Sequence, residues 1–172
     1  MFTLYTDGSC SGNGEEENFG GMGIVLVKDG KVVKEYSIAD FNTTNNRAEM
    51  KAVIYAINIA KILNKTDPRE ILIYSDSAYV VQTVNQWMFN WASKGWKKAD
   101  NKEPENLDLV KSLYQLMQFE RAIKVVKIKG HNGHEFNELA DDLATRATEK
   151  AKEEAVKTTS KNNSKENIYV IE

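Results

Sequence analysis

The order of strand-like and helix-like segments is the feature of this sequence that most limits its fold. Three strand patterns come first, at 2–7, 20–28 and 31–39, and the Asp29-Gly30 pair between the last two is typical of a tight hairpin. Residues 45–63 then place apolar side chains at helical spacing. The chain therefore begins with antiparallel strands and continues with a helix.

The remainder of the chain alternates helices with two further strands. Residues 70–75 form a short, nearly continuous apolar run, which is typical of a strand buried on both faces, and 122–128 form a fifth strand pattern. Helical patterns occupy 77–91, 106–119 and the segment from about 135 onward. This order predicts an α/β protein with a mixed sheet and helices packed on it.

The length of 172 residues fits one domain, which we expect to span residues 1–150. Residues 151–172 are expected to form a polar, flexible tail, because amphipathic order is lost after Lys150. The apolar tetrad at 168–171 has three possible fates: it adds to a sheet edge, it docks on the core, or it remains disordered.

Several bulk properties limit the function classes. The chain has one cysteine, no apolar run close to the ~20 residues of a membrane span, and no basic-then-apolar leader, so we expect a cytoplasmic protein with no membrane partner. The net charge of −2 argues against a uniformly basic nucleic-acid binder. The charges are segregated, however: 94–102 carries four lysines and one aspartate, and 121–130 is basic without any acid.

Three acidic residues fall at the ends of expected elements. Asp7 closes the first strand pattern, Asp76 follows the strand at 70–75, and Glu49 lies in the first turn of the helix that starts near residue 45. If the first and fourth strands are neighbours, these carboxylates meet at one edge of the sheet, where they would repel one another unless a cation lies between them. Oxygen ligands on rigid elements suit Mg²⁺ or Mn²⁺.

Each acid also has a purely structural interpretation. Asp7 could form a turn with the following glycine, Glu49 could complete a capping box with Asn46, and Asp76 or Ser75 could cap the next helix. The convergence of all three acids on one expected edge favours a site.

A fourth acid is ambiguous from spacing. In the last helix, Asp141 and Asp142 flank the packed stripe on opposite sides, so helical phase does not choose between them.

Five segments in series resemble type 1 ribonuclease H, the bacterial ribonuclease HI kind, from about Phe2 to Ala147. They are "YTDGSCSGNG", "TTNNRAEMKAV", "YSDSAYVVQTV", the tryptophan–lysine segment and "KGHNGHEFNELADDLA". The resemblance implies a five-stranded mixed sheet, with three antiparallel strands followed by two parallel ones. It also implies an endonuclease that hydrolyses the RNA strand of RNA–DNA hybrids and leaves 3′-hydroxyl and 5′-phosphate ends.

The resemblance implies that Asp7, Glu49, Asp76 and Asp141 bind two Mg²⁺ ions, with Mn²⁺ able to substitute. Asp141 rather than Asp142 falls at the matching distance after "GHNGH". One ion would be shared by Asp7 and Asp141, and the other would be held by Asp7, Glu49 and Asp76.

His131 matches the family histidine that assists proton transfer or product release. Its alternative, a zinc pair with His134, is disfavoured because a structural zinc needs four ligands and the single cysteine, Cys10, is far away in sequence.

The resemblance also implies contacts with the RNA–DNA hybrid. Asn13, Asn45 and Asn46 would read 2′-hydroxyls in the minor groove, since an amide can both donate and accept, although turn formation is an alternative for each. The DNA strand would lie against Tyr79 and Trp91. Thr44 and Asn106 would hold one of its phosphates.

A basic protrusion would grip the hybrid through alternating aromatic and basic residues. These are Trp87, Trp91, Lys94, Trp96, Lys97, Lys98 and Lys102. The alternative is a helix pair with a core face and a solvated face. The glutamates at 15–17 depart from the family pattern and would repel a phosphate backbone.

Two other functions stay open beside the endonuclease, which we expect to be a monomer. One is a catalytically silent hybrid-binding module, which would have no use for four mutually repelling carboxylates. The other is a different nuclease of the same fold, such as a polymerase-associated domain, an exonuclease or a resolvase.

Overall fold

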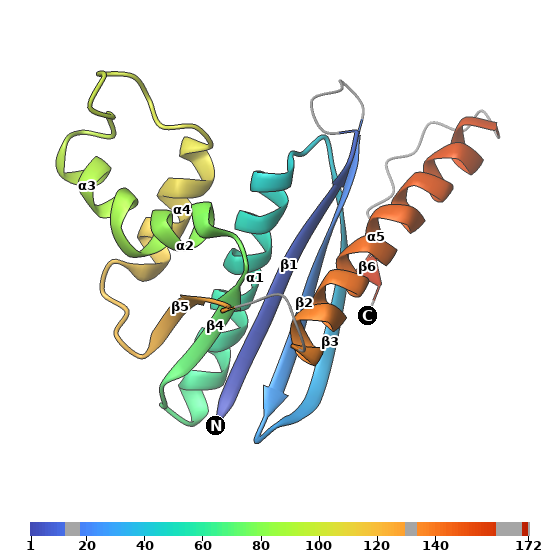
Figure 1. Ribbon diagram of the computed structural model, residues 1–172, viewed down its shortest axis with the longest axis horizontal. Helices are drawn as coiled ribbons and strands as arrows, with labels where there is room; N and C mark the ends of the chain where they lie inside the picture. Colours follow the sequence, from blue (N-terminus) through green and yellow to red (C-terminus); the bar gives the residue numbers. More distant parts are fainter. Residues whose placement is uncertain (13–17, 130–133, 161–169, 172) are drawn as a thin grey trace.

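A computed structural model describes residues 1–12, 18–129, 134–160 and 170–171 of the chain. It forms one mixed sheet in the order β5-β4-β1-β2-β3-β6 with helices on both faces (Figure 1). The strands are β1 (Phe2–Ser11), β2 (Phe19–Lys28), β3 (Lys31–Phe41), β4 (Ile71–Ser75), β5 (Ile123–Lys127) and β6 (Val170–Ile171). The helices are α1 (Asn45–Thr66), α2 (Ala78–Gln82), the π-helical turn η1 (Thr83–Trp87), α3 (Met88–Ser93), α4 (Leu107–Met117) and α5 (Glu135–Ser160).

The strand pairing confirms the expected mixed sheet. β1 is central: it pairs antiparallel with β2 along its whole length, with Asp7 opposite Gly23, and parallel with β4, with Tyr5 beside Tyr74. β4 pairs parallel with β5, and β2 pairs antiparallel with β3. The five strands β3-β2-β1-β4-β5 therefore have the predicted arrangement.

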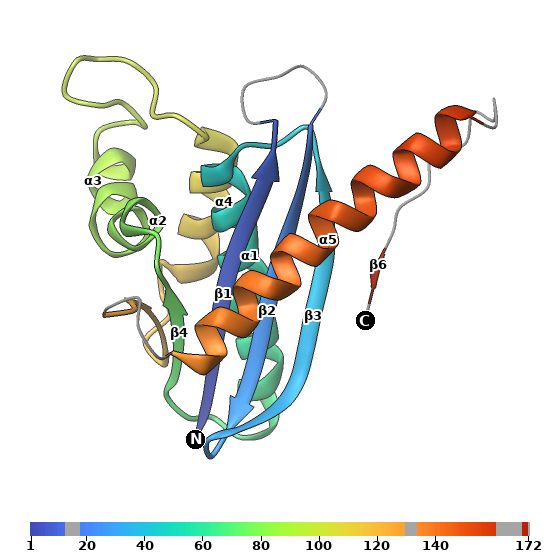
Figure 2. The ribbon, with the colours of Figure 1, turned by 45° about the vertical axis from the view of Figure 1, so that its right-hand side comes forward.

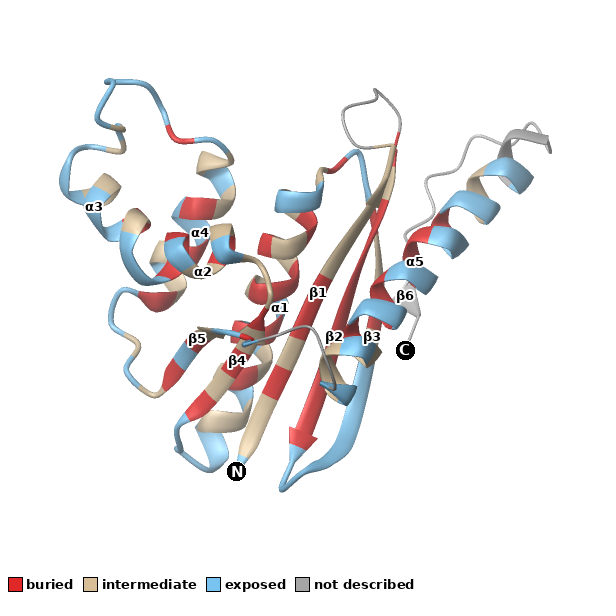
Figure 3. Ribbon diagram, viewed as in Figure 1, coloured by how far each residue is buried: buried red, intermediate tan, exposed pale blue. Residues whose placement is uncertain are grey.

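Two hydrophobic layers hold the helices on the sheet, because successive residues of a strand point to opposite faces. On one face, Leu4 and Ile24 pack with the buried side of α1 and with α4. On the other face, Val25 and Val27 pack with Ala140 and Leu143 of α5. Figure 2 shows α5 crossing β1, β2 and β3, with α1 and α4 behind the sheet, and Figure 3 shows the buried core positions that follow from this arrangement.

The first strand is longer than its apolar alternation indicates. β1 continues to Ser11, so the expectation that it ends at Asp7 is wrong. The extra residues are held by the antiparallel partner, since Gly8 to Ser11 pair with residues 19–22 of β2. Asp7 therefore lies within a strand, and the alternative of a simple turn at this position is excluded.

Two helical segments also differ from the sequence expectation. The helix expected over 77–91 is divided by η1, and Thr83 Oγ1 bonds to the Tyr79 carbonyl at 2.7 Å just where the π-helical turn starts. The last helix continues to Ser160, beyond the expected loss of helical order at Lys150.

The C-terminal apolar segment contributes an edge strand. Val170 and Ile171 pair antiparallel with Ile38 and Ser37 of β3, which corresponds to the sheet-edge alternative.

The domain boundary near residue 150 stays a prediction. Among the residues that the structure describes, no helix has the length and apolar character needed to cross a bilayer.

Gly23 allows α5 to approach the sheet closely. A Cβ added at this residue would lie 2.0 Å from the Ala140 carbonyl oxygen and 2.8 Å from the Ala144 nitrogen. These are backbone atoms, which cannot move aside as the end of a flexible side chain can.

We therefore expect Gly23→Ala to lower the free energy of unfolding by about 1–3 kcal/mol, the usual cost of overpacking. Urea unfolding followed by circular dichroism measures the change. Val33→Ala, at an exposed position of β3, is the control and should stay within about 0.5 kcal/mol of the wild type. A Gly23→Ala protein as stable as the wild type would contradict the close contact.

Candidate active site

The pairing of β1 with β4 brings two acids together. The parallel register pairs Tyr5 with Tyr74, and two positions further along each chain segment the carboxylate oxygens of Asp7 and Asp76 lie within 4.8 Å of each other. Asp76 follows β4 directly, and α2 begins after it with Ser77 as its cap.

Glu49 reaches the same place from α1 because the helix and β1 nearly touch. A Cβ added at Gly8 would lie 2.4 Å from the Glu49 nitrogen, so only glycine fits here without displacing the helix. The Gly8 backbone also hydrogen-bonds to the Glu49 carboxylate.

Asp7, Glu49 and Asp76 form a compact carboxylate cluster. One oxygen of each lies within 4.8 Å of the others. Asp7 is only 7% exposed, and Glu49 Oε2 is buried without a hydrogen-bond partner. An unpartnered, buried carboxylate oxygen next to two more carboxylates is a costly arrangement, and it fits a site that receives a cation.

Asp141 lies near enough to Asp7 to contribute to the rise of its pKa, whereas Asp142 forms an ion pair with Arg146 on the outer side of α5. This position favours Asp141 over Asp142, and the role of Asp141 as the fourth acid of the site stays a prediction.

The cluster holds protons when no cation is present. Burial, followed by a hydrogen bond and the charge of Glu49, raises the pKa of Asp7 to about 10, with smaller contributions from Asp141 and Asp76. Burial also raises the pKa of Glu49 to about 7, and the Asp76 charge adds to this, while hydrogen bonds with Asp7 and Gly8 act in the opposite direction. A cation entering the cluster would displace these protons.

The structural alternatives for Glu49 and Asp76 are wrong. Thr44, not Asn46, caps α1, since the Arg47 backbone N–H donates to Thr44 Oγ1 at 3.1 Å. Ser77 caps α2 by accepting from the Val80 N–H at 3.2 Å. Neither acid is needed as a helix cap, so their side chains are free for another role.

A cavity of about 650 Å³ adjoins the N-terminus of α1. It is lined by Thr44, Asn45, Asn46, Glu105 and Asn106, which include four of the residues expected to contact the hybrid. Glu105 was not predicted from the sequence to line this cavity, although its position next to Asn106 could have indicated that it does.

Arg47 was also missed, although it lies inside the "TTNNRAEMKAV" segment. Its guanidinium reaches Asp108 and Asn106, at the start of α4. Spacing along the chain gives no sign of these contacts.

The expected aromatic residues form a row on the helices beside this cavity. Tyr79 contacts Trp87 edge-on, with ring centroids 6.1 Å apart, and Trp87 contacts Trp91 at 6.0 Å. Trp96 instead packs edge-on against Tyr114 of α4 at 5.3 Å. All four rings are half-buried, and those of Tyr79, Trp91 and Trp96 pack against the main hydrophobic core.

The expected basic residues follow this aromatic row. Lys94, Lys97 and Lys102 are exposed and Lys98 is half-buried. Three other expected features, Asn13, the glutamates at 15–17 and His131, lie outside the described residues.

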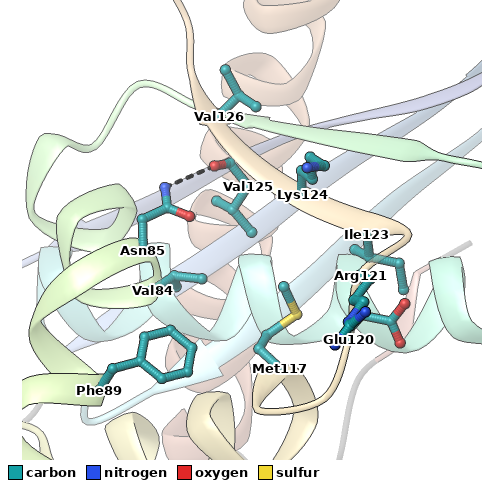
Figure 4. Close-up of a pocket in the computed structure, with 10 residues that line it drawn as sticks. All are labelled: Val84, Asn85, Phe89, Met117, Glu120, Arg121, Ile123, Lys124, Val125 and Val126. Carbon is teal, nitrogen blue, oxygen red and sulfur yellow. Dashed lines mark hydrogen bonds between the residues drawn. The ribbon is translucent and has the colours of Figure 1, made fainter.

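A second cavity, of about 560 Å³, lies at the β5 edge of the sheet (Figure 4). Its walls are mainly apolar, with Val84 and Phe89 on one side and Met117 and Ile123 on the other. Asn85 Nδ2 donates to the Val125 carbonyl at 2.9 Å and so covers part of the strand edge. None of the four acids lines this cavity, so it is separate from the candidate active site.

Comparison with known proteins agrees with this geometry. The RNase H family model matches residues 1–149. The ribonuclease H of Clostridium botulinum (strain Hall) is 41% identical over 145 residues, covering 84% of this chain and 93% of that protein. The ribonuclease H of Agrobacterium fabrum is 42% identical over 146 residues, covering 85% of this chain and 93% of that protein.

Solved structures give the same answer. The PFV RNase H domain superposes with a TM-score of 0.73 at 30% identity, covering 86% of this chain and 94% of that domain. LC9-RNase H1, a type 1 RNase H with the type 2 active-site motif, has a TM-score of 0.69 at 32% identity, and the match covers 87% of this chain and 72% of that chain. The chain therefore belongs to the ribonuclease H family, whose members depend on metal ions. The expected resemblance to type 1 ribonuclease H and the expected enzyme class are confirmed.

The raised pKa values give a pH-dependent prediction for the metal-free protein. Folding raises the pKa of Asp7 and of Glu49, so the folded state binds more protons than the unfolded state. The wild type should then be most stable near the unfolded carboxyl pKa of ~4 and lose stability as the pH rises through about 7 toward about 10. Asp7→Asn should therefore exceed the wild type by at least about 1 kcal/mol at about pH 8, with the difference shrinking toward about pH 5.

Urea unfolding in the presence of a chelator measures this difference. Asp142→Asn is the matched control, because Asp142 pairs with Arg146 and not with the cluster. A difference between Asp7→Asn and the wild type that does not change with pH would refute the raised pKa values.

Proposed function

We propose that the protein is an endonuclease that hydrolyses the RNA strand of RNA–DNA hybrids, using two Mg²⁺ ions held by Asp7, Glu49, Asp76 and Asp141. The observation that carries this proposal is the cluster of three acids from β1, α1 and the end of β4, with Asp141 of α5 near enough to affect the pKa of Asp7, in a chain of the ribonuclease H family. A structure of the related LC11-RNase H1 is a complex with an RNA/DNA hybrid, and supports this class of substrate.

The donor set suits Mg²⁺. All four proposed ligands are carboxylates, which hard divalent cations prefer, and Glu49 Oε2 offers an oxygen with no hydrogen-bond partner among the described residues. Mn²⁺, which accepts the same ligands, should substitute. When bound, the two ions would activate a water and stabilise the leaving 3′ oxygen.

Individual residues would have different roles in the reaction. Asp7 lies in one cluster with Glu49 and Asp76, and Asp141 also contributes to the rise of its pKa, so it is the carboxylate best placed to be shared between two ions. We assign proton transfer or product release to His131, as the family resemblance implies. The products are a 3′-hydroxyl and a 5′-phosphate.

Substrate would be held beside the acids on α1, α2, α3 and α4. We assign a DNA phosphate to Thr44 and Asn106, and RNA 2′-hydroxyls to Asn45 and Asn46, together with Asn13. The half-buried rings of Tyr79, Trp87 and Trp91 offer a surface for the DNA strand, with Lys94, Lys97, Lys98 and Lys102 near its phosphates.

Asp7→Asn should abolish cleavage and retain hybrid binding, because it removes the central carboxylate and leaves the surface that contacts the hybrid unchanged. Labelled RNA, RNA–DNA hybrid and duplex DNA, incubated with Mg²⁺, Mn²⁺ or chelator, test the wild type. We expect cleavage of the hybrid alone, and none with chelator. Hybrid binding without cleavage by the wild type would instead indicate a silent binding module.

Glutamine at Lys94, Lys97 and Lys98 should raise KM and leave kcat unchanged. Each lost phosphate contact should reduce the slope of log KM against log salt by about 0.7–0.9. Lys28→Gln with Lys31→Gln and Lys34→Gln, exposed on β2 and β3, is the matched control for the loss of three positive charges. An equal effect in both variants would show that net charge, and not this surface, controls binding.

A further inference from the structure

We infer that Arg47 is a positioning residue that holds the Asn106 amide so that its nitrogen can donate to one ionised phosphodiester of the DNA strand in the cavity lined by Thr44 and Asn106. This inference rests on the proposed function, because it specifies how the same enzyme holds its substrate. Arg47 does not line this cavity and is not one of the four acids proposed to bind metal, so its role would be to position Asn106.

Asn106 has an unusual conformation for a residue at the start of a helix. It occupies the cap position of α4 with φ 56° and ψ 35°, in the left-handed region, and its side chain makes no capping hydrogen bond. Asparagine is among the best capping residues, so a non-capping asparagine in a disfavoured conformation indicates that its side chain is used elsewhere.

The Asn106 side chain is held from two sides. Its Oδ1 accepts from Arg47 at 3.4 Å, and its Nδ2 donates to the Tyr79 hydroxyl at 3.1 Å. A guanidinium can only donate, so the amide oxygen must face Arg47 and the amide nitrogen must face away from it. One of the two N–H bonds of Nδ2 then remains for a ligand in the cavity.

Thr44 lines the same cavity. The backbone N–H of residue 47 donates to Thr44 Oγ1 at 3.1 Å, a bond that does not depend on the arginine side chain, and the hydroxyl hydrogen can be donated to a ligand. The Asn106 amide nitrogen and the Thr44 hydroxyl can then both donate into the cavity. A phosphodiester oxygen, which only accepts, fits this arrangement, and the N-terminus of the 22-residue α1 adds a favourable field.

Asp108 fixes the guanidinium in place. It accepts from both terminal nitrogens of Arg47, at 2.9 and 2.7 Å, and this pairing lowers the pKa of Asp108 to about 2. Because its charge is already paired, Arg47 acts through geometry more than through free positive charge. Lysine cannot reproduce a fork that contacts two acceptors at once.

Glu105 works against anion binding in the same cavity. It is exposed and lines the wall beside Asn106. A pocket with a nearby carboxylate needs well-oriented donors to retain a phosphate, so the positioning by Arg47 matters more here than in a basic pocket.

Hybrids that carry one neutral methylphosphonate at each DNA linkage in turn provide the test. For the wild type, one position should raise KM about tenfold with kcat unchanged, which corresponds to the loss of charge-assisted hydrogen bonds. Arg47→Gln and Arg47→Lys should each raise KM on the unmodified hybrid by a similar factor and lose the extra penalty at that position. Asp108→Asn, a milder change at an exposed residue, should show the same loss of position-specific sensitivity to a smaller extent.

Arg69→Gln is the matched control, because Arg69 also forms an exposed ion pair with an aspartate, far from the cavity. It should retain the full position-specific penalty. Complete rescue by Arg47→Lys would show that charge suffices and would overturn the positioning role. So would an unchanged methylphosphonate penalty in all Arg47 and Asp108 variants. Absence of hybrid cleavage by the wild type would instead refute the proposed function.

Discussion

The close confinement of Asp7, Glu49 and Asp76 is the constraint on which the rest of the structure depends. If all three were ionised, carboxylates with one oxygen each within 4.8 Å would repel one another strongly. The backbones hold them together, because the parallel pairing of β1 with β4 brings Asp7 near Asp76 and the missing side chain of Gly8 lets α1 place Glu49 against β1. The raised pKa values of Asp7 and Glu49 favour bound protons, which relieve this repulsion, and a bound cation would replace those protons.

The substrate side of the molecule follows a different principle. Asp7 and Asp76 are positioned by sheet pairing, whereas Asn106 is held by the side chain of Arg47, which connects α1 with the start of α4. The Tyr79 hydroxyl extends this connection to α2 and so to the row of aromatic rings. In the proposed function, recognition of the DNA strand and hydrolysis of the RNA strand would therefore depend on separate sets of contacts that share the first turn of α1.

Local patterns were sufficient to predict the sheet, the main helices and the positions of the three clustered acids, because strand and helix periodicities are strong in 2–7, 45–63 and 70–75. Features that depend on distant partners could not be predicted. β1 extends past Asp7 only because β2 pairs with it. The Arg47–Asp108 pair joins residues 61 positions apart, and the π-helical turn shifts helical phase by a single residue that averaged periodicity does not register.

The close approach of α5 to Gly23 has a consequence for the fourth acid. Ala140, which touches this glycine, immediately precedes Asp141, and Gly23 is the direct neighbour of Asp7 across the sheet. This close contact limits how far α5 can move along its own axis relative to β2. A slide of one residue would shift Asp141 by about 1.5 Å and turn it by about 100°, away from Asp7. The contact between Gly23 and Ala140 therefore determines where Asp141 lies relative to Asp7.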